Sequence, residues 1–283
     1  MLVTRDTQRV EILALPPGES KERDLTWLDW SLPAAISADG KKVLFSESGE
    51  GGGVGYSVYI RKTDGSPAVR LGEGSSQDLS HDGEWVLAIV HSASDPQLVA
   101  YPTGAGEPKA FSKEGISVFG ASFLPDGKQI LFTGSEPGRG PRLYLRDFAG
   151  GKPRALTPEG YNGLGILSPD GKWAVVRGPD RKRYLYPLSG GEPTLVPGLD
   201  LEDGVDQRSA DGRFLYVHRS GESPMKVYRL EIATGRKELW RTLMPADAAG
   251  VSSFGAGPTP DGSAYVYSYI RTLSDLYLVD GVK

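Results

Sequence analysis

Short apolar runs recur along the chain, and each begins four positions after an aspartate. Three consecutive apolar residues, rather than strict alternation with polar ones, predict strands that are covered on both faces. A second kind of run follows, in which a tyrosine stands beside aliphatic residues; among the repeats only Leu98–Ala100 lacks it at that place. These tyrosines fit packing between neighbouring sheets better than a binding stripe. The apolar runs are Val43–Phe45, Val86–Ala88, Ile130–Phe132, Ala174–Val176, Leu215–Val217 and Tyr265–Tyr267.

An Asp-Gly dipeptide precedes each apolar run and predicts a tight turn. Glycine tolerates a positive φ there, and the aspartate can accept hydrogen bonds from nearby backbone N–H groups. Successive aspartates are 43, 44, 44, 41 and 50 residues apart. Such a period is typical of radial β-repeats, in which each unit buries its faces against its neighbours. We expect a structural role for the six aspartates, which are Asp39, Asp82, Asp126, Asp170, Asp211 and Asp261.

Four strands are predicted in each repeat. In the clearest unit they cover residues 164–167, 172–176, 184–188 and 194–196. Six repeats of four strands predict an all-β fold, a six-bladed β-propeller with four-stranded antiparallel blades. The chain then forms one domain, residues 1–283, in which residues 1–30 precede the repeats. The repeats cover about 31–74, 75–116, 117–160, 161–200, 201–250 and 251–283.

The chain ends indicate how the ring closes. The sixth repeat has three predicted strands and no fourth, and these strands are Gly255–Pro258, Ala264–Ser268 and Leu276–Val279. Residues Arg23–Thr26 can supply the fourth, so that N- and C-terminal strands share one composite blade. Two further N-terminal strands, Leu2–Thr4 and Val10–Leu15, are then left over. A seven-bladed ring with an incomplete extra blade is therefore the alternative, and its first strand would lie upstream of Met1 in a longer polypeptide.

The Ser-Pro-Asp-Gly repeats resemble the TolB-like propeller family, a relative of the WD-type propellers, over essentially the whole chain. Longer runs resemble the C-terminal propeller region of bacterial eukaryotic-like serine/threonine protein kinases: ESKERDL at 19–25, RKTDGSPAVRLGEG at 61–74, and residues 267–269 and 273–278. In that family a kinase domain precedes a propeller with a sensory or interaction role. The resemblance implies a binding module of a signalling protein, on the extracytoplasmic side of a bacterial membrane if the family's topology holds, and otherwise in the cytoplasm.

Composition and charge narrow the functional classes. The net charge is −4 and the pI about 5.5, so no basic footprint indicates a nucleic-acid partner. No apolar run is long enough to span a bilayer and the first ten residues do not form a signal peptide, so we expect no membrane contact by this chain itself. The absence of cysteine excludes disulfides, thiol catalysis and thiolate metal sites, but it does not indicate a compartment.

No catalytic motif stands out in the sequence. A Gly-rich loop before Val-Ala-x-Lys, His-Arg-Asp, Asp-Phe-Gly and Gly-x-Ser-x-Gly are all missing, so kinase activity is not implied. His81 lies in an Asp-Gly turn, whereas His91 and His218 follow second strands of different repeats, so the three are not expected to converge on a metal. The acidic loop 200–206 is rich in oxygen ligands but lacks EF-hand spacing. We therefore expect no enzyme activity, metal or cofactor. A propeller-type hydrolase or lactonase with a channel metal, or a stand-alone TolB-like interaction scaffold, are the alternatives.

Binding residues are expected on the face opposite the Asp-Gly turns. There the loops vary in length and sequence, and the segments leading into each first strand bring aromatic, amide and carboxylate groups towards the channel. We expect a monomer that binds a protein or small-molecule ligand at this loop-rich face. The candidate rim residues are Trp27, Asp29, Trp30, Gln77, Phe119, Tyr161, Asn162, Asp203, Asp206 and Phe254.

Overall fold

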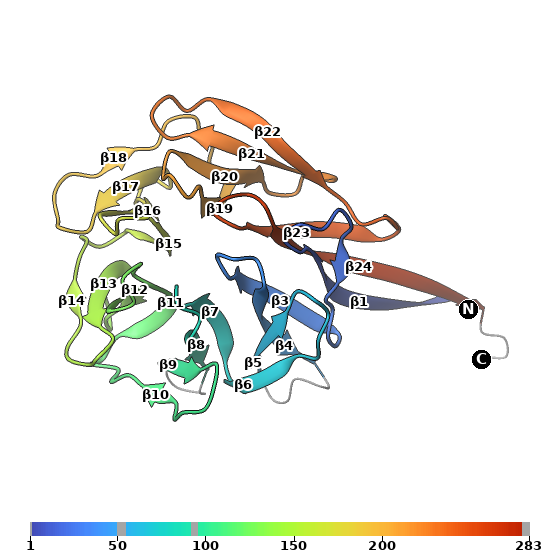
Figure 1. Ribbon diagram of the computed structural model, residues 1–283, viewed down its shortest axis with the longest axis horizontal. Coiled ribbons are helices and arrows are strands. Elements are labelled where there is room, and N and C mark those ends of the chain that lie inside the picture. The colour runs from blue at the N-terminus through green and yellow to red at the C-terminus, as the bar shows by residue number, and fades with distance from the viewer. Residues whose placement is uncertain (1, 50–54, 92–95, 279–283) are drawn as a thin grey trace.

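Antiparallel sheets arranged around a common centre make up the protein, as the computed structural model shows (Figure 1). The structure describes residues 2–49, 55–91 and 96–278, so the glycine-rich residues 51–54 and the end of the predicted strand at Val279 lie outside it. The described residues form strands β1 to β24 and no helix. The fold is therefore all-β with a propeller-like arrangement of sheets, as predicted. The described residues contain no helix that is long and apolar enough to cross a membrane.

Four of the sheets contain four strands each, in sequence order from the centre outwards. The first comprises β7 (Ser75–Leu79), β8 (Trp85–Val90), β9 (Gln97–Pro102) and β10 (Lys109–Ala110). The second comprises β11 (Ser117–Phe123), β12 (Gln129–Ser135), β13 (Arg142–Asp147) and β14 (Arg154–Ala155). The third comprises β15 (Asn162–Leu167), β16 (Trp173–Arg177), β17 (Arg183–Pro187) and β18 (Thr194–Leu195). The fourth comprises β19 (Asp203–Arg208), β20 (Phe214–Arg219), β21 (Met225–Glu231) and β22 (Lys237–Leu243).

The remaining strands form one eight-stranded sheet rather than two separate blades. One half comprises β3 (Trp30–Ile36), β4 (Lys42–Ser48), β5 (Ser57–Lys62) and β6 (Val69–Glu73). The other comprises β23 (Val251–Pro258), β24 (Tyr265–Leu278), β1 (Leu2–Leu15) and β2 (Arg23–Asp24). A single parallel bridge between Val10 and Trp30 joins the halves, and the Val10 N–H donates to Asp29 O at 3.0 Å. The expected six separate four-stranded sheets are thus replaced by four such sheets and one sheet of eight strands.

The two ends of the chain pair with each other over a long stretch. All of β1 runs antiparallel to β24, from Leu15 opposite Tyr265 to Leu2 opposite Leu278, and β2 adds outside β1. The N-terminus therefore supplies both outer strands of the composite half-sheet. The prediction of a separate third strand at Leu276 was wrong, because those residues continue β24. Likewise the N-terminal strands are not left over, since they form the single strand β1.

The paired strands β1 and β24 extend beyond the ring as a two-stranded ribbon (Figure 1). Closer to the ring, two tyrosine hydroxyls hold the turn between β1 and β2. Tyr265 and Tyr267 donate to the two carboxylate oxygens of Glu22, at 2.6 and 3.1 Å. Contacts between residues more than 240 positions apart therefore close the ring, and the closure depends on both ends of the chain.

The six Asp-Gly turns are built alike. In five of them a Ser or Thr hydroxyl donates to the aspartate two positions later, as Ser168 does to Asp170 at 2.7 Å. The same hydroxyl oxygen accepts the N–H of the next strand, for example that of Trp173 at 3.1 Å. Each turn glycine has φ between 67° and 71°, a conformation that side chains with a Cβ rarely adopt. These hydrogen bonds lower the pKa of the Asp170 carboxyl, the one from Ser168 contributing most.

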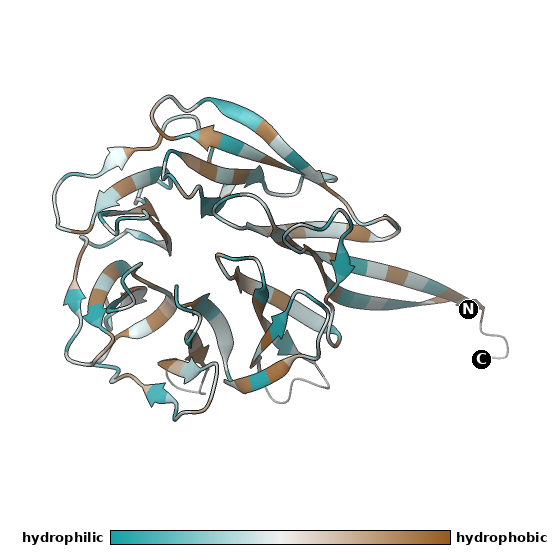
Figure 2. Cartoon of the chain, in the orientation of Figure 1, coloured by the Kyte–Doolittle hydropathy of each residue, from teal (hydrophilic) through white to brown (hydrophobic). Residues whose placement is uncertain are grey.

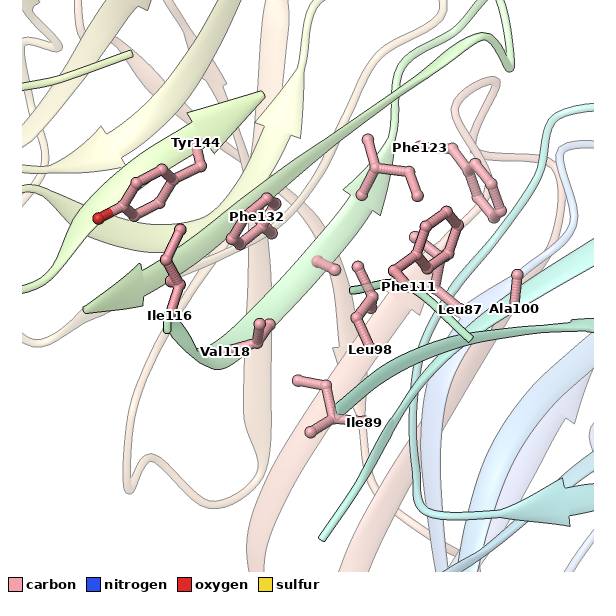
Figure 3. Packing of buried hydrophobic residues seen from close by; sticks show 12 residues of the cluster. Leu87, Ile89, Leu98, Ala100, Phe111, Ile116, Val118, Phe123, Phe132 and Tyr144 are labelled. Atoms are coloured by element: carbon pink, nitrogen blue, oxygen red, sulfur yellow. The ribbon is translucent and has the colours of Figure 1, made fainter. Parts of the chain in front are cut away.

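The apolar core lies between adjacent sheets, as stacked blades require. Figure 3 shows one such cluster, in which Ile89 and Leu98 of one sheet face Val118, Phe132 and Tyr144 of the next. The central residues of the predicted apolar runs are almost completely buried. Outer strands such as β10 and β14 carry hydrophilic residues (Figure 2). The burial pattern predicted from unbroken apolar runs is thus confirmed.

Candidate functional site: the central channel

Every strand nearest the centre contains an irregularity in its pairing. These strands are β3, β7, β11, β15, β19 and β23. A β-bulge leaves one residue unpaired and redirects its side chain. In five strands the unpaired residue is single, and these residues are Ala34, Gln77, Phe119, Asp206 and Ser253. Three of these residues, Ala34, Gln77 and Asp206, line the cavity at the centre of the ring, whereas Phe119 and Ser253 do not.

A cavity of about 610 Å³ occupies this centre. All six innermost strands line it, which makes it the channel of the propeller. At one end it reaches residues of the Asp-Gly turns, including His81, Pro125 and Pro260. Elsewhere the cavity passes between β15 and β19 and reaches Arg177 and Arg183. A cavity of this size, lined by convergent polar groups, is typical of ligand sites.

Asp78 lies on the channel wall and has no cationic partner among the residues that the structure describes. Its two carboxylate oxygens accept backbone N–H groups, from Leu79 and from Phe123 in the next sheet, both at 2.8 Å. Burial raises the pKa of Asp78 to about 7, and these two hydrogen bonds only partly oppose the shift. Asp78 therefore bridges two blades while its charge is poised to change near neutral pH.

Asp206 and His218 form a buried pair behind the channel. Both carboxylate oxygens of Asp206 lie 2.9 Å from His218 Nδ1, and the side chains are 7% and 12% exposed. Burial lowers the pKa of His218, but the hydrogen bond and charge of Asp206 outweigh it and raise the pKa overall. Gly204 makes room for the ring, since a Cβ there would come within 2.6 Å of His218 Cε1. The pair is thus held together by packing as well as charge.

Three arginines also line the cavity. Arg208 donates through Nε to Leu167 O at 2.5 Å and through Nη1 to Ser209 O at 3.3 Å, so backbone carbonyls hold it. Arg177 and Arg183 are a directly opposed pair on β16 and β17. Burial, and then the positive charge of Arg177, lower the pKa of Arg183. The channel wall thus carries three arginines beside the carboxyl groups of Asp78 and Asp206.

The predicted rim residues Trp27, Asp29 and Trp30 belong to the segment leading into β3. Buried Glu47 fixes this segment, since it accepts the Trp30 N–H at 2.8 Å and the Ser31 hydroxyl at 2.6 Å. Trp27 is 37% exposed and lies under the Arg61 guanidinium. Asp29 is exposed and pairs with Arg9 at 3.7 Å. None of the three lines the cavity.

The other predicted rim residues divide into three groups. Gln77, Asn162 and Asp206 line the cavity, whereas Phe119, 55% exposed, lies with Asn162 in a separate hollow of about 420 Å³. Tyr161 and Phe254 pack against neighbouring tyrosines. Asp203 is only 4% exposed and pairs with Lys237 at 2.6 Å, which is a structural contact. The structure therefore brings together some of the predicted residues and gives others packing roles.

Sequence reasoning did not identify Asp78, Arg177, Arg183 or Arg208 as channel residues. The bulges explain this, because a strand that gains a residue changes which side chains face inwards. Polar residues near the end of a first strand, such as Asp78 in β7 and Arg208 in β19, were the available signal. Within the described residues, no group of three or more histidine, aspartate and glutamate side chains has the geometry of a metal site.

Solved structures with the same architecture include TolB proteins. A putative TolB from Agrobacterium tumefaciens superposes with a TM-score of 0.67 at 19% identity, covering 94% of this chain and 99% of that one. TolB from Acinetobacter baumannii gives a TM-score of 0.62 at 20% identity, covering 83% of this chain and 66% of that one. This chain has the fold of a TolB-like β-propeller. It spans just under two thirds of the Acinetobacter protein.

A weaker structural similarity is found with a protein of a different kind. A chain in the crystal structure of a nidogen/laminin complex gives a TM-score of 0.56 at 14% identity, covering 83% of this chain and 94% of that one. No protein-family model and no curated protein matches the sequence. At these identities the likenesses concern the fold, and the function has to be argued from the channel.

Proposed function

We propose that this TolB-like propeller is a non-catalytic module that binds a protein or small-molecule ligand through its central channel. The observation that carries the proposal is the cavity of about 610 Å³ lined by all six innermost strands. Its wall combines Gln77, Asn162 and Asp206 with unpaired backbone at the bulges. Propellers as different as TolB and the nidogen/laminin complex share the architecture, which supports protein binding as the use of this scaffold.

The number of blades is also part of the proposal. We count the eight-stranded sheet as two blades, because within the described part of the chain its halves are paired at one bridge, between Val10 and Trp30. The ring then has six blades and is closed by β1 and β2. Asp29 and Trp30 lie at this junction, on the loop-rich face, where we place the outer contacts of the partner.

The biological context follows from the sequence resemblance. We place the module in a bacterial serine/threonine kinase signalling protein, where it acts as the sensory or interaction part. Its runs at 19–25 and 61–74 meet in space, since Arg23 donates to Asp64 O at 2.5 Å. In that setting the module is monomeric and lies on the extracytoplasmic side of the membrane. A TolB-like interaction scaffold in the periplasm is the stand-alone form of the same proposal.

Filling the channel tests the function. Ala34 is an exposed bulge residue on the cavity wall, so Ala34→Trp adds a large side chain inside the channel without removing a contact. The matched control is Leu239→Trp, at a 56% exposed position on outer strand β22. Tagged forms of both variants and the parent protein are compared for proteins or metabolites retained from native extract. Loss of the retained ligand with Ala34→Trp alone is expected; equal retention by both variants contradicts binding in the channel.

A further inference from the structure

We infer that Arg177 and Arg183 form a binding site for the carboxylate or phosphate group of an anionic ligand in the channel. The inference rests on the proposed function and names the chemistry of its ligand. The two residues are direct cross-strand partners at the ends of β16 and β17, so both side chains lie on one face of the sheet. Both line the cavity.

That face of the sheet looks towards the next blade. Val175 and Leu185, the next residues on the same face, pack with Leu215 and Val217 of the neighbouring sheet. Arg177 and Arg183 continue this face beyond the apolar cluster, where the sheets separate and the cavity enters between them. Residues Gly204–Asp206 of β19 form the opposite wall. The two guanidinium groups therefore flank a crevice that opens into the channel.

Neither arginine has a carboxylate partner among the described residues. The acids on the facing segment pair with other cations: Asp206 with His218, Asp203 with Lys237, and Asp200 and Glu202 with Arg219. Asp180, on the loop between β16 and β17, accepts the Tyr184 hydroxyl at 2.9 Å. The negative charge of Asp203 acts on Arg183 as well but is shared with Lys237. The two guanidinium groups therefore leave the crevice with a positive local charge.

Two opposed arginines repel each other. Like charges directly opposite on neighbouring strands destabilise a sheet, and partial burial weakens the screening of that repulsion by solvent. Guanidinium groups offer planar pairs of N–H donors that match carboxylate and phosphate oxygens. An oxyanion between them removes the repulsion and satisfies the donors. Asn162, the β15 residue paired with Arg177, also lines the cavity, and its amide adds a polar contact to the same ligand.

The test uses purified protein and small anions, without any partner. Thermal unfolding and calorimetric titration in low-salt buffer are recorded with inorganic phosphate, with citrate and with a short polyglutamate peptide. The double variant Arg177→Gln/Arg183→Gln is compared with Arg154→Gln, which removes one positive charge at an exposed position of outer strand β14. Each single variant is measured as well, so that the response can be assigned to both residues.

We expect the parent protein and Arg154→Gln to be stabilised by an anion, and the double variant to bind it at least about tenfold more weakly. Without anion, the double variant should melt at the same or a higher temperature than the parent, because repulsion has been removed. A stronger response to phosphate than to citrate and polyglutamate assigns a phosphate ligand, and the reverse assigns a carboxylate.

Three results would overturn the inference: no anion stabilises the parent protein, the double variant responds as the parent does, or the double variant melts lower without anion. The last result would show that the arginines serve the fold. Because no partner is present in these titrations, their failure leaves the channel-filling test of the proposed function unaffected. Retention of ligand by Ala34→Trp, in turn, would contradict the function without deciding whether the anion site exists.

Discussion

Asp78 should make the stability of this protein fall as pH rises through the mildly acidic range. Its pKa is about 7 in the folded protein, against about 3.9 for an unperturbed aspartate in the unfolded chain. A carboxyl group with a raised folded pKa binds more protons in the folded state, so folding is penalised progressively between about pH 4 and pH 7. A shift of about three pKa units corresponds to about 4 kcal/mol at pH 8.

The perturbation is Asp78→Asn, which removes the ionisation and keeps the shape. The amide has one acceptor oxygen, so one of the N–H groups of Leu79 and Phe123 loses its partner, at a cost of about 1 to 3 kcal/mol. At pH 4 the variant should therefore be less stable than the parent by about that amount. By pH 8 the difference in the free energy of unfolding between variant and parent should have shifted by about 4 kcal/mol in favour of the variant.

Urea unfolding followed by tryptophan fluorescence at several pH values from 3 to 8 measures this difference in the free energy of unfolding. Groups that titrate equally in both proteins, such as the Asp206–His218 pair, cancel in the comparison. Asp170→Asn is the matched control, because hydrogen bonding lowers the folded pKa of Asp170. Its substitution should become more costly as pH rises through about 4, the opposite trend. A difference between Asp78→Asn and the parent that does not change with pH would refute the reasoning.

Two further substitutions test the packing around the channel. Gly204→Ala places a Cβ against His218 and should lower the free energy of unfolding by about 2 kcal/mol; unchanged stability in urea unfolding would show that the ring moves aside without cost. Glu47→Ala leaves the Trp30 N–H and the Ser31 hydroxyl without their acceptor and should cost about 3 kcal/mol, measured in the same way. If it costs less than about 1 kcal/mol, the segment leading into β3 is fixed by other contacts.

The repeat itself could be predicted from the sequence because its determinants are local. Each Asp-Gly turn needs a glycine with positive φ and an aspartate that accepts nearby hydrogen bonds, and both requirements are met within a few residues. Asp170 and Gly171 illustrate this, with a turn that matches the prediction. The apolar runs such as Val43–Phe45 were also reliable, since burial on both faces needs no knowledge of the partner.

The terminal strands and the channel wall could not be predicted because distant contacts determine them. Residues Leu276–Leu278 have the tyrosine pattern of a third strand, yet pairing with β1 keeps them in β24. The side-chain direction of Asp206 depends on a bulge that the sequence does not announce. Arg177 and Arg183 reach the cavity only because β15 pairs irregularly in front of them. Each of these features arises when two segments meet in three dimensions.

Site-specific photo-crosslinking tests the central claim most directly, namely that a ligand or partner enters the channel. A benzophenone amino acid replaces Gln77 on the channel wall, or Leu239 on the outer strand as control, and the labelled proteins are irradiated in native extract. The account predicts a defined crosslinked species from position 77 and none from position 239, with mass spectrometry placing the attachment at residue 77. Crosslinking from position 239 alone would contradict it.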